Sequence, residues 1–72
     1  MTKDEAIIQI EKGKKLTHYY FTADEYVFLN YAGLYETEDG VAVTKELFWT
    51  YHFNKIFDDE WEFYDQQDET KL

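Results

Sequence analysis

The chain contains no cysteine, and in only 72 residues this absence limits the available folds more than any other feature. A domain of this size buries only about 60% of the surface that its unfolded chain exposes, and very small folds often depend on disulfides or structural metals. A chain without thiols forms neither disulfides nor thiolate metal sites. We therefore expect one domain with one core, stabilised by apolar packing.

The side chains available for this packing are mainly aromatic. Six Phe, seven Tyr and two Trp make up 21% of the sequence, and each such ring can bury roughly 150–250 Å². A small domain has much surface for its volume, so we expect most individual rings in the core and some at the surface. Contiguous exposed apolar surface is typical of contact sites.

The charge of the chain is strongly negative and unevenly distributed. Sixteen Asp and Glu accompany seven Lys and no Arg, which gives a formal net charge of −9. Residues 1–20 carry a net charge of +1 and residues 21–72 carry −10. Because nucleic-acid binding depends on neutralising phosphates with Lys and Arg, we expect no direct binding to nucleic acid. A protein with a basic surface, or a second copy of the chain, is the expected partner.

The sequence does not favour a membrane protein. It contains no run of eighteen apolar residues, and Met1 precedes a polar segment instead of the apolar core of a signal peptide. We therefore expect no membrane partner and a cytoplasmic location.

The first helix is predicted over residues 3–12. Thr2 and Glu5 have the spacing of a capping box, in which each side chain bonds the backbone N–H of the other residue. Gly13 is suited to the C-terminal end of a helix. Apolar residues recur at helical spacing between these ends, at Ala6, Ile7 and Ile10.

The middle of the chain predicts antiparallel strands. Aromatic, β-branched or alternating residues are concentrated in four segments, 16–21, 26–31, 34–37 and 61–64. Turn signals separate them, and the strongest is the Asp39-Gly40 pair. We predict a sheet of three to four strands.

A second, aromatic-rich helix is predicted over residues 45–54, with Thr44 as its N-cap. Its apolar residues lie on more than one face, so it either sits between two layers or presents an aromatic edge outward. The fold class is thus α+β, with a single domain over residues 1–64 and an acidic, frayed C-terminal tail over residues 65–72.

Catalytic and metal-binding patterns are weak. The chain has neither Ser nor Cys, and His18 and His52 are its only histidines, so acyl transfer by a nucleophile and its base is not expected. The two histidines and nearby carboxylates lack the spacing of a metal site. We interpret His18 as a packed, hydrogen-bonded imidazole and His52 as a partly exposed residue. No enzymatic activity, catalytic residue, metal or cofactor is predicted.

The strongest functional signal is acidic. Residues 58–72 hold seven acids and one lysine. One interpretation is a solvated edge that maintains solubility. The other is a recognition surface for a basic partner, with aromatic contact residues inside an acidic rim. The residues predicted for that contact are Trp49, Asp58, Asp59, Glu60, Trp61, Glu62 and Tyr64.

The basic residues Lys12, Lys14 and Lys15 surround Gly13 at the end of the first predicted helix. Cations are favoured at that end of the helix dipole, and no phosphate-loop pattern surrounds them. We therefore assign them to the helix end and not to a phosphate site.

Several segments together resemble a group of short uncharacterised proteins encoded by phages and prophages of gut bacteria. The resemblance spans most of the chain up to Trp61 and lies in turns, caps and aromatic positions, so it implies an origin but no activity or site residue. The segments are Met1 to Ile7, Gly13 to His18, Phe21 to Glu25, Glu38 to Gly40 and Phe48-Trp49.

The resemblance adds a functional expectation, because small acidic phage products often act as stoichiometric inhibitors or modulators of host machinery. Our hypothesis is a non-enzymatic binding protein of this type, whose acidic surface imitates a nucleic-acid backbone or otherwise binds a basic host protein. The alternative is a structural protein that assembles into a homo-oligomer through exposed aromatic residues.

Overall fold

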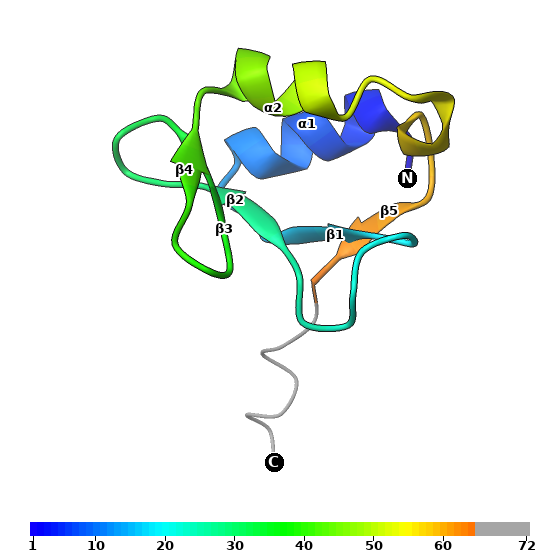
Figure 1. The fold of residues 1–72 in the computed structure, drawn as a ribbon, viewed down its shortest axis with the longest axis horizontal. Coiled ribbons are helices and arrows are strands. Elements are labelled where there is room, and N and C mark those ends of the chain that lie inside the picture. The colour runs from blue at the N-terminus through cyan, green and yellow to red at the C-terminus, as the bar shows by residue number, and fades with distance from the viewer. Residues whose placement is uncertain (65–72) are drawn as a thin grey trace.

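The computed structural model describes residues 1–64, and the predicted tail at 65–72 lies outside them. The described part contains two α-helices, one 3-10 helix and five β-strands, shown in Figure 1. In chain order these are α1 (Lys3–Glu11), β1 (Leu16–His18), β2 (Val27–Leu29), β3 (Tyr35–Thr37), β4 (Ala42–Val43), α2 (Lys45–Tyr51), η1 (Lys55–Phe57) and β5 (Trp61–Phe63).

All strands form one antiparallel sheet in the order β4-β3-β2-β1-β5. The last strand of the described chain therefore lies beside the first, with Leu16 opposite Phe63 and His18 opposite Trp61. The predicted α+β class is confirmed, but five strands replace the predicted three to four. The additional strand is β4, which has only two residues and is too short to show an alternating pattern.

The strands and α2 are shorter than predicted because side chains terminate them. The predicted strand 16–21 ends at His18, whose ring Nδ1 accepts the Tyr20 N–H at 3.0 Å. The predicted strand 26–31 is reduced to β2 because Asn30 Oδ1 accepts two backbone N–H groups of the next turn. The predicted helix 45–54 ends at Tyr51, and the Asn54 side chain caps the separate helix η1.

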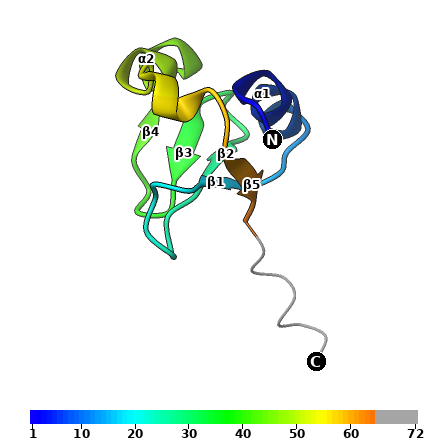
Figure 2. The same ribbon diagram turned by 90° about the vertical axis from the view of Figure 1, so that its right-hand side faces the viewer.

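Both α-helices cover the same face of the sheet, as Figure 2 shows. The predicted capping box of Thr2 and Glu5 is present at the start of α1, and Thr44 caps α2. The core forms between the helices and the strands, with buried residues Ala6, Ile10, Leu16, Val27, Tyr35, Phe48 and Trp61. Neither α-helix within residues 1–64 is long and apolar enough to cross a membrane.

The strand register determines which residues lie on the opposite face. Since side chains alternate along a strand, the neighbours of the core residues Leu16, Val27 and Trp61 point away from the helices. Thr17 is paired with Glu62, and Phe28 is paired with Glu36. No α-helix of the described chain covers this face, which we call the open face.

Candidate functional site

The structure separates the seven residues predicted to contact a partner into three environments. Trp49 and Trp61 belong to the core side of the sheet. The exposed residues Asp58, Asp59 and Glu60 form the turn that precedes β5. Glu62 and Tyr64 lie on the open face, because they alternate with Trp61 along β5. The predicted residues therefore do not form one continuous site.

Trp61 is a core residue and not an exposed one. Its side chain is 1% exposed, and its indole Nε1–H donates to the Phe57 carbonyl oxygen at 2.8 Å. Its ring packs edge-on against Trp49, with the centroids 5.4 Å apart. The strong acidity around it in the sequence suggested exposure, but the alternation of β5 points this one side chain inward.

Trp49 is half-buried and is also held by the fold. Its Nε1–H donates to the hydroxyl of Tyr35 at 3.2 Å, and the Lys3 ammonium lies 5.1 Å from its ring centroid. A partner can reach part of this ring without moving the core.

The exposed acids that precede β5 are joined by one from the start of the chain. The Lys3 N–H donates to the Asp58 carbonyl oxygen at 2.9 Å, which places the N-terminus of α1 beside this turn. Thr2, Lys3, Asp4 and Asp58 line an open hollow of about 380 Å³ there. We call Asp4, Asp58, Asp59 and Glu60 the acidic corner. The sequence does not indicate Asp4 as part of this site, because Asp4 lies in the segment without net negative charge.

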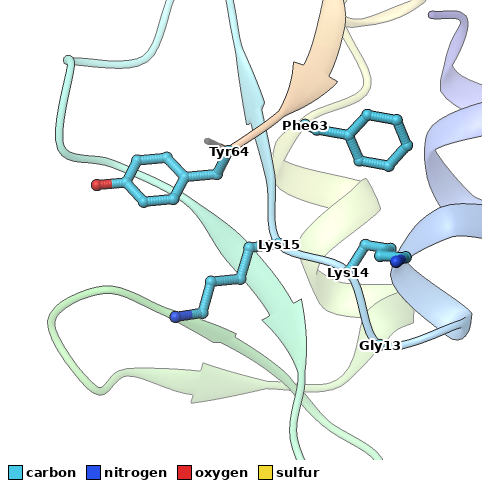
Figure 3. Close-up of a pocket in the computed structure, with 5 residues that line it drawn as sticks. All are labelled: Gly13, Lys14, Lys15, Phe63 and Tyr64. Atoms are coloured by element: carbon cyan, nitrogen blue, oxygen red, sulfur yellow. The ribbon is translucent and has the colours of Figure 1, made fainter. Parts of the chain in front are cut away.

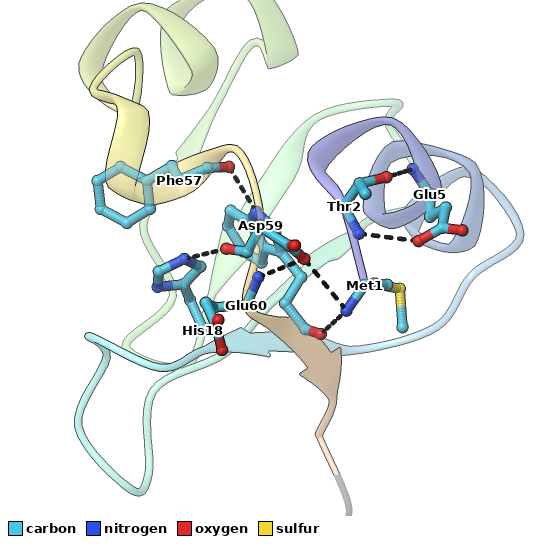
Figure 4. Close-up of polar contacts among 8 residues, drawn as sticks. Met1, Thr2, Glu5, His18, Phe57, Asp59 and Glu60 are labelled. Atoms are coloured by element: carbon cyan, nitrogen blue, oxygen red, sulfur yellow. Dashed lines mark hydrogen bonds and ion pairs between the residues drawn. The ribbon is translucent and has the colours of Figure 1, made fainter.

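Asp59 is anchored within this corner, as Figure 4 shows. Its carboxylate accepts the Glu60 N–H at 2.8 Å and lies 3.9 Å from the ammonium of Met1. Its carbonyl oxygen is 2.8 Å from Nε2 of His18. In contrast, the carboxylates of Asp58 and Glu60 make no hydrogen bond or ion pair with any described residue. The corner thus combines one structural carboxylate with neighbours that are available to a partner.

Glu60 has an unusual backbone conformation. Its φ of 75° is in the left-handed region, and it is the only such non-glycine residue within residues 1–64. A conformation of this kind costs on the order of 1–3 kcal/mol and persists where its surroundings fix it. Here the Glu60 carbonyl accepts the Tyr19 N–H at 3.1 Å and the next residue begins β5. The result is an exposed glutamate on a fixed backbone.

Three rings gather around a lysine at the open face. The Tyr26 and Tyr64 ring centroids are 4.6 Å apart, and those of Tyr26 and Phe28 are 6.1 Å apart. The Lys15 ammonium lies 4.7 Å from the Tyr26 centroid and 5.8 Å from that of Phe28. We call Tyr26, Phe28 and Tyr64 the aromatic platform. Of these residues only Tyr64 was predicted as a contact, because the sequence pattern places Lys15 at a helix end and the other two rings in a strand.

A hollow of about 490 Å³ lies beside the platform, between the turn after α1 and the end of β5. Gly13, Lys14, Lys15, Phe63 and Tyr64 line it. Figure 3 shows Tyr64 and Lys15 on one side of the strand and Phe63 on the other, toward α1. The platform is thus reached from an open, positively charged rim.

The second helix presents an aromatic edge outward, which is one of the two arrangements expected from its sequence. Phe48 is buried, while Tyr51 is 72% exposed and Phe53 is 79% exposed. We call the exposed residues Val41, Leu47, Tyr51 and Phe53 the α2 edge. Next to this edge is a mainly apolar hollow of about 260 Å³, lined in part by Val41, Tyr51 and His52.

Both histidines are hydrogen-bonded and packed against aromatic rings. His18 is 3% exposed and hydrogen-bonded, as the sequence predicted. His52 is half-buried, stacked on Phe48 at a centroid distance of 4.1 Å, and bonded to the Phe48 carbonyl through Nδ1. No group of three His, Asp or Glu residues in positions 1–64 could hold a metal ion.

Few of the acids are neutralised by cations. Over residues 1–64 the ion pairs are Lys45 with Glu11, at 3.1 Å, and the N-terminal ammonium of Met1 with Asp59. The hydrogen bond from Lys45 to Glu11 raises the pKa of that lysine above its ordinary value. The hydroxyl of Thr37 donates to Asp39 and lowers the pKa of that carboxyl. The remaining acidic surface interacts mainly with solvent.

The three candidate interaction surfaces are therefore the acidic corner, the aromatic platform and the α2 edge. No protein-family model, curated protein or solved structure matches the chain.

Proposed function

We propose that this protein is a non-enzymatic binding protein whose acidic corner, together with Glu62 on the open face, contacts the basic surface of another protein. The observation that carries the proposal is that the acidic residues of the corner differ in their bonding within the fold. The backbone carbonyl of Asp59 bonds His18 of β1, and the Asp59 carboxylate accepts the Glu60 N–H. The carboxylates of Asp58 and Glu60 remain unpaired among the described residues.

This arrangement favours binding for an energetic reason. An exposed carboxylate on a fixed backbone loses only side-chain freedom, and no backbone freedom, when a cation binds it, so less of the interaction energy is lost on association. Several such groups of one sign also steer a basic partner toward the surface and accelerate encounter. The net charge of −9 acts in the same direction.

The partner class follows from the same charges. A basic protein surface that normally binds a phosphate backbone is complementary to a cluster of exposed carboxylates. The resemblance to phage-encoded proteins adds the proposal that the partner is a host protein in the host cytoplasm and that binding inhibits or modulates it. A host defence protein that acts on nucleic acid would combine these features.

The proposal is tested by capturing partners from host-type lysate and then measuring affinity for the purified partner. Neutralising the free acids with Asp58→Asn and Glu60→Gln should weaken binding, and high salt should weaken it further. The matched control is Asp24→Asn with Glu46→Gln, which removes the same charge at two exposed positions away from the corner. Equal affinity of the two double variants would reject the acidic corner as the contact.

A second candidate function, self-assembly, is favoured by the α2 edge. Val41 directly precedes β4, and Tyr51 lines the same hollow as Val43 of β4. Within the described sheet, β4 has a neighbouring strand on one side only. Light scattering at increasing concentration tests this function. If assembly uses this edge, Tyr51→Lys should convert an oligomer to a monomer, whereas Tyr31→Lys, at a fully exposed residue elsewhere, should not.

A further inference from the structure

Lys15 lies over the aromatic platform in a chain that is rich in acids. Its ammonium is 4.7 Å from the Tyr26 centroid and 5.8 Å from the Phe28 centroid. It forms no ion pair with any described carboxylate, although the whole chain holds sixteen Asp and Glu. Within residues 1–64, the Lys15 ammonium therefore contacts aromatic rings and no carboxylate.

We propose that the aromatic platform is a receptor for an arginine side chain of the protein partner, and that Lys15 occupies it in the free protein. The proposal rests on the proposed function and names the group that the partner inserts. The rings attract cations through their negative faces, at distances within the range of such contacts, up to about 6 Å. Lys15 demonstrates that a cation fits there.

Carboxylates flank the platform on the open face. Glu62 precedes Tyr64 by two residues and therefore lies on the same face of β5. Glu36 is directly opposite Phe28 in the strand register. In the strand register, one acid therefore lies on the β3 side of the rings and one on the β5 side, and Oε1 of Glu36 also accepts a hydrogen bond from the Asn30 amide at 3.0 Å. The two acids favour a positively charged guest, whereas Lys14 and Lys15 line the adjoining hollow and oppose it, so Lys15 has to leave the rings before an arginine can bind there.

Arginine fits the platform better than lysine does. A guanidinium is planar, stacks on aromatic faces and can donate two parallel hydrogen bonds to a carboxylate. An ammonium is compact and more strongly hydrated. The chain contains no arginine of its own, so an arginine that displaces Lys15 from the rings must belong to another molecule. The adjoining hollow of about 490 Å³ leaves room for Lys15 to move aside.

The test is an NMR titration of the intact protein with two blocked peptides of equal charge, tetra-arginine and tetra-lysine. Tetra-arginine should bind more tightly and should shift the ring resonances of Tyr26, Phe28 and Tyr64. Because a cation–π contact at an exposed site is worth about 0.5–1 kcal/mol, Tyr26→Leu should weaken tetra-arginine binding by about two- to five-fold. Tyr26→Phe keeps the ring and should retain the affinity.

The occupancy by Lys15 is tested by a matched pair of lysine variants. Lys15→Met and Lys14→Met remove the same charge from adjacent positions, but Lys15 is the one whose ammonium lies over the rings. Lys15→Met should raise the affinity for tetra-arginine more than Lys14→Met does. Equal effects of the two, or preferential binding of a mononucleotide phosphate to the wild-type platform, would overturn the proposal.

The platform and the acidic corner can fail separately. If Asp58→Asn with Glu60→Gln weakens partner binding while Tyr26→Leu does not, the proposed function stands and the arginine receptor is rejected. If Tyr26→Leu weakens tetra-arginine binding but the acid variants leave partner binding unchanged, the platform stands and the acidic corner is rejected as the contact.

Discussion

Nε2 of His18 lies 2.8 Å from the carbonyl oxygen of Asp59, 41 residues further along the chain. The other ring nitrogen, Nδ1, accepts the backbone N–H of Tyr20 at 3.0 Å. One buried imidazole therefore ends β1 and also fixes the turn that carries the acidic corner. A neutral ring with its proton on Nε2 satisfies both bonds, because Nδ1 must be free to accept.

His18→Phe should lower the free energy of unfolding by about 1–3 kcal/mol, because the ring volume is kept while an N–H and a carbonyl lose their partner. Urea denaturation followed by fluorescence measures the change. Nitrogen-15 NMR of the wild-type histidines should show the proton on Nε2 of His18. A matched control is Tyr31→Ala at a fully exposed residue, for which a change within about 0.5 kcal/mol is expected. Equal stability of His18→Phe and wild type would contradict the structural role.

The features of the fold that the sequence predicted correctly depend on residues close together in the chain. The capping box of Thr2 and Glu5 and the N-cap Thr44 are where the sequence predicted them. The strand ends were overestimated because His18 and Asn30 terminate strands through their side chains, and such bonds leave no periodic signal. The two-residue strand β4 is too short for one.

The candidate site was less predictable because it is assembled from distant segments. The acids at Asp58 and Glu60 are exposed, but the sequence could not show that Asp4 joins them. The aromatic platform requires the pairing of β1 with both β2 and β5, and strand order cannot be read from composition. The part of the acidic segment predicted as a tail, residues 65–72, lies outside the described residues.

Glu60 is held at a φ of 75°, so a residue without a Cβ should relieve its backbone. Glu60→Gly should raise the free energy of unfolding by up to about 1 kcal/mol relative to Glu60→Ala, which removes the same charge but keeps the Cβ. Thermal and urea denaturation of both variants measure the difference. Glu60→Ala equal to or more stable than Glu60→Gly would show that the left-handed conformation is not strained.

Tyr35 makes the stability sensitive to alkaline pH. Desolvation by burial raises its pKa above the ordinary value of 10.0, although the hydrogen bond from Trp49 opposes this. The folded state therefore keeps the phenol protonated to higher pH than the unfolded chain does. Unfolding releases its proton above about pH 10, and the stability contributed by the neutral phenol is lost as pH rises through the folded pKa.

Wild-type protein should accordingly lose more stability between pH 8 and pH 11 than Tyr35→Phe, which has no ionisable phenol at that position. Urea denaturation at several pH values provides the comparison. Tyr19→Phe, at an exposed tyrosine, should keep the wild-type pH dependence. Parallel stability profiles for wild type and Tyr35→Phe would mean that another group controls alkaline unfolding.

The two tryptophans should differ in both exposure and effect. Trp61 is 1% exposed, whereas Trp49 is half-buried beside the Lys3 ammonium. Trp49→Phe leaves Trp61 as the only indole, and Trp61→Phe leaves Trp49. Acrylamide should quench the fluorescence of Trp49→Phe less than that of Trp61→Phe. Trp61→Phe should also destabilise the protein more, because it opens space in the core and removes the 2.8 Å bond to the Phe57 carbonyl.

A partner should still bind Trp61→Phe at temperatures where it remains folded, since a buried indole contributes to recognition only by maintaining the sheet. Weaker binding by a fully folded Trp61→Phe would contradict this and would place that indole in the contact.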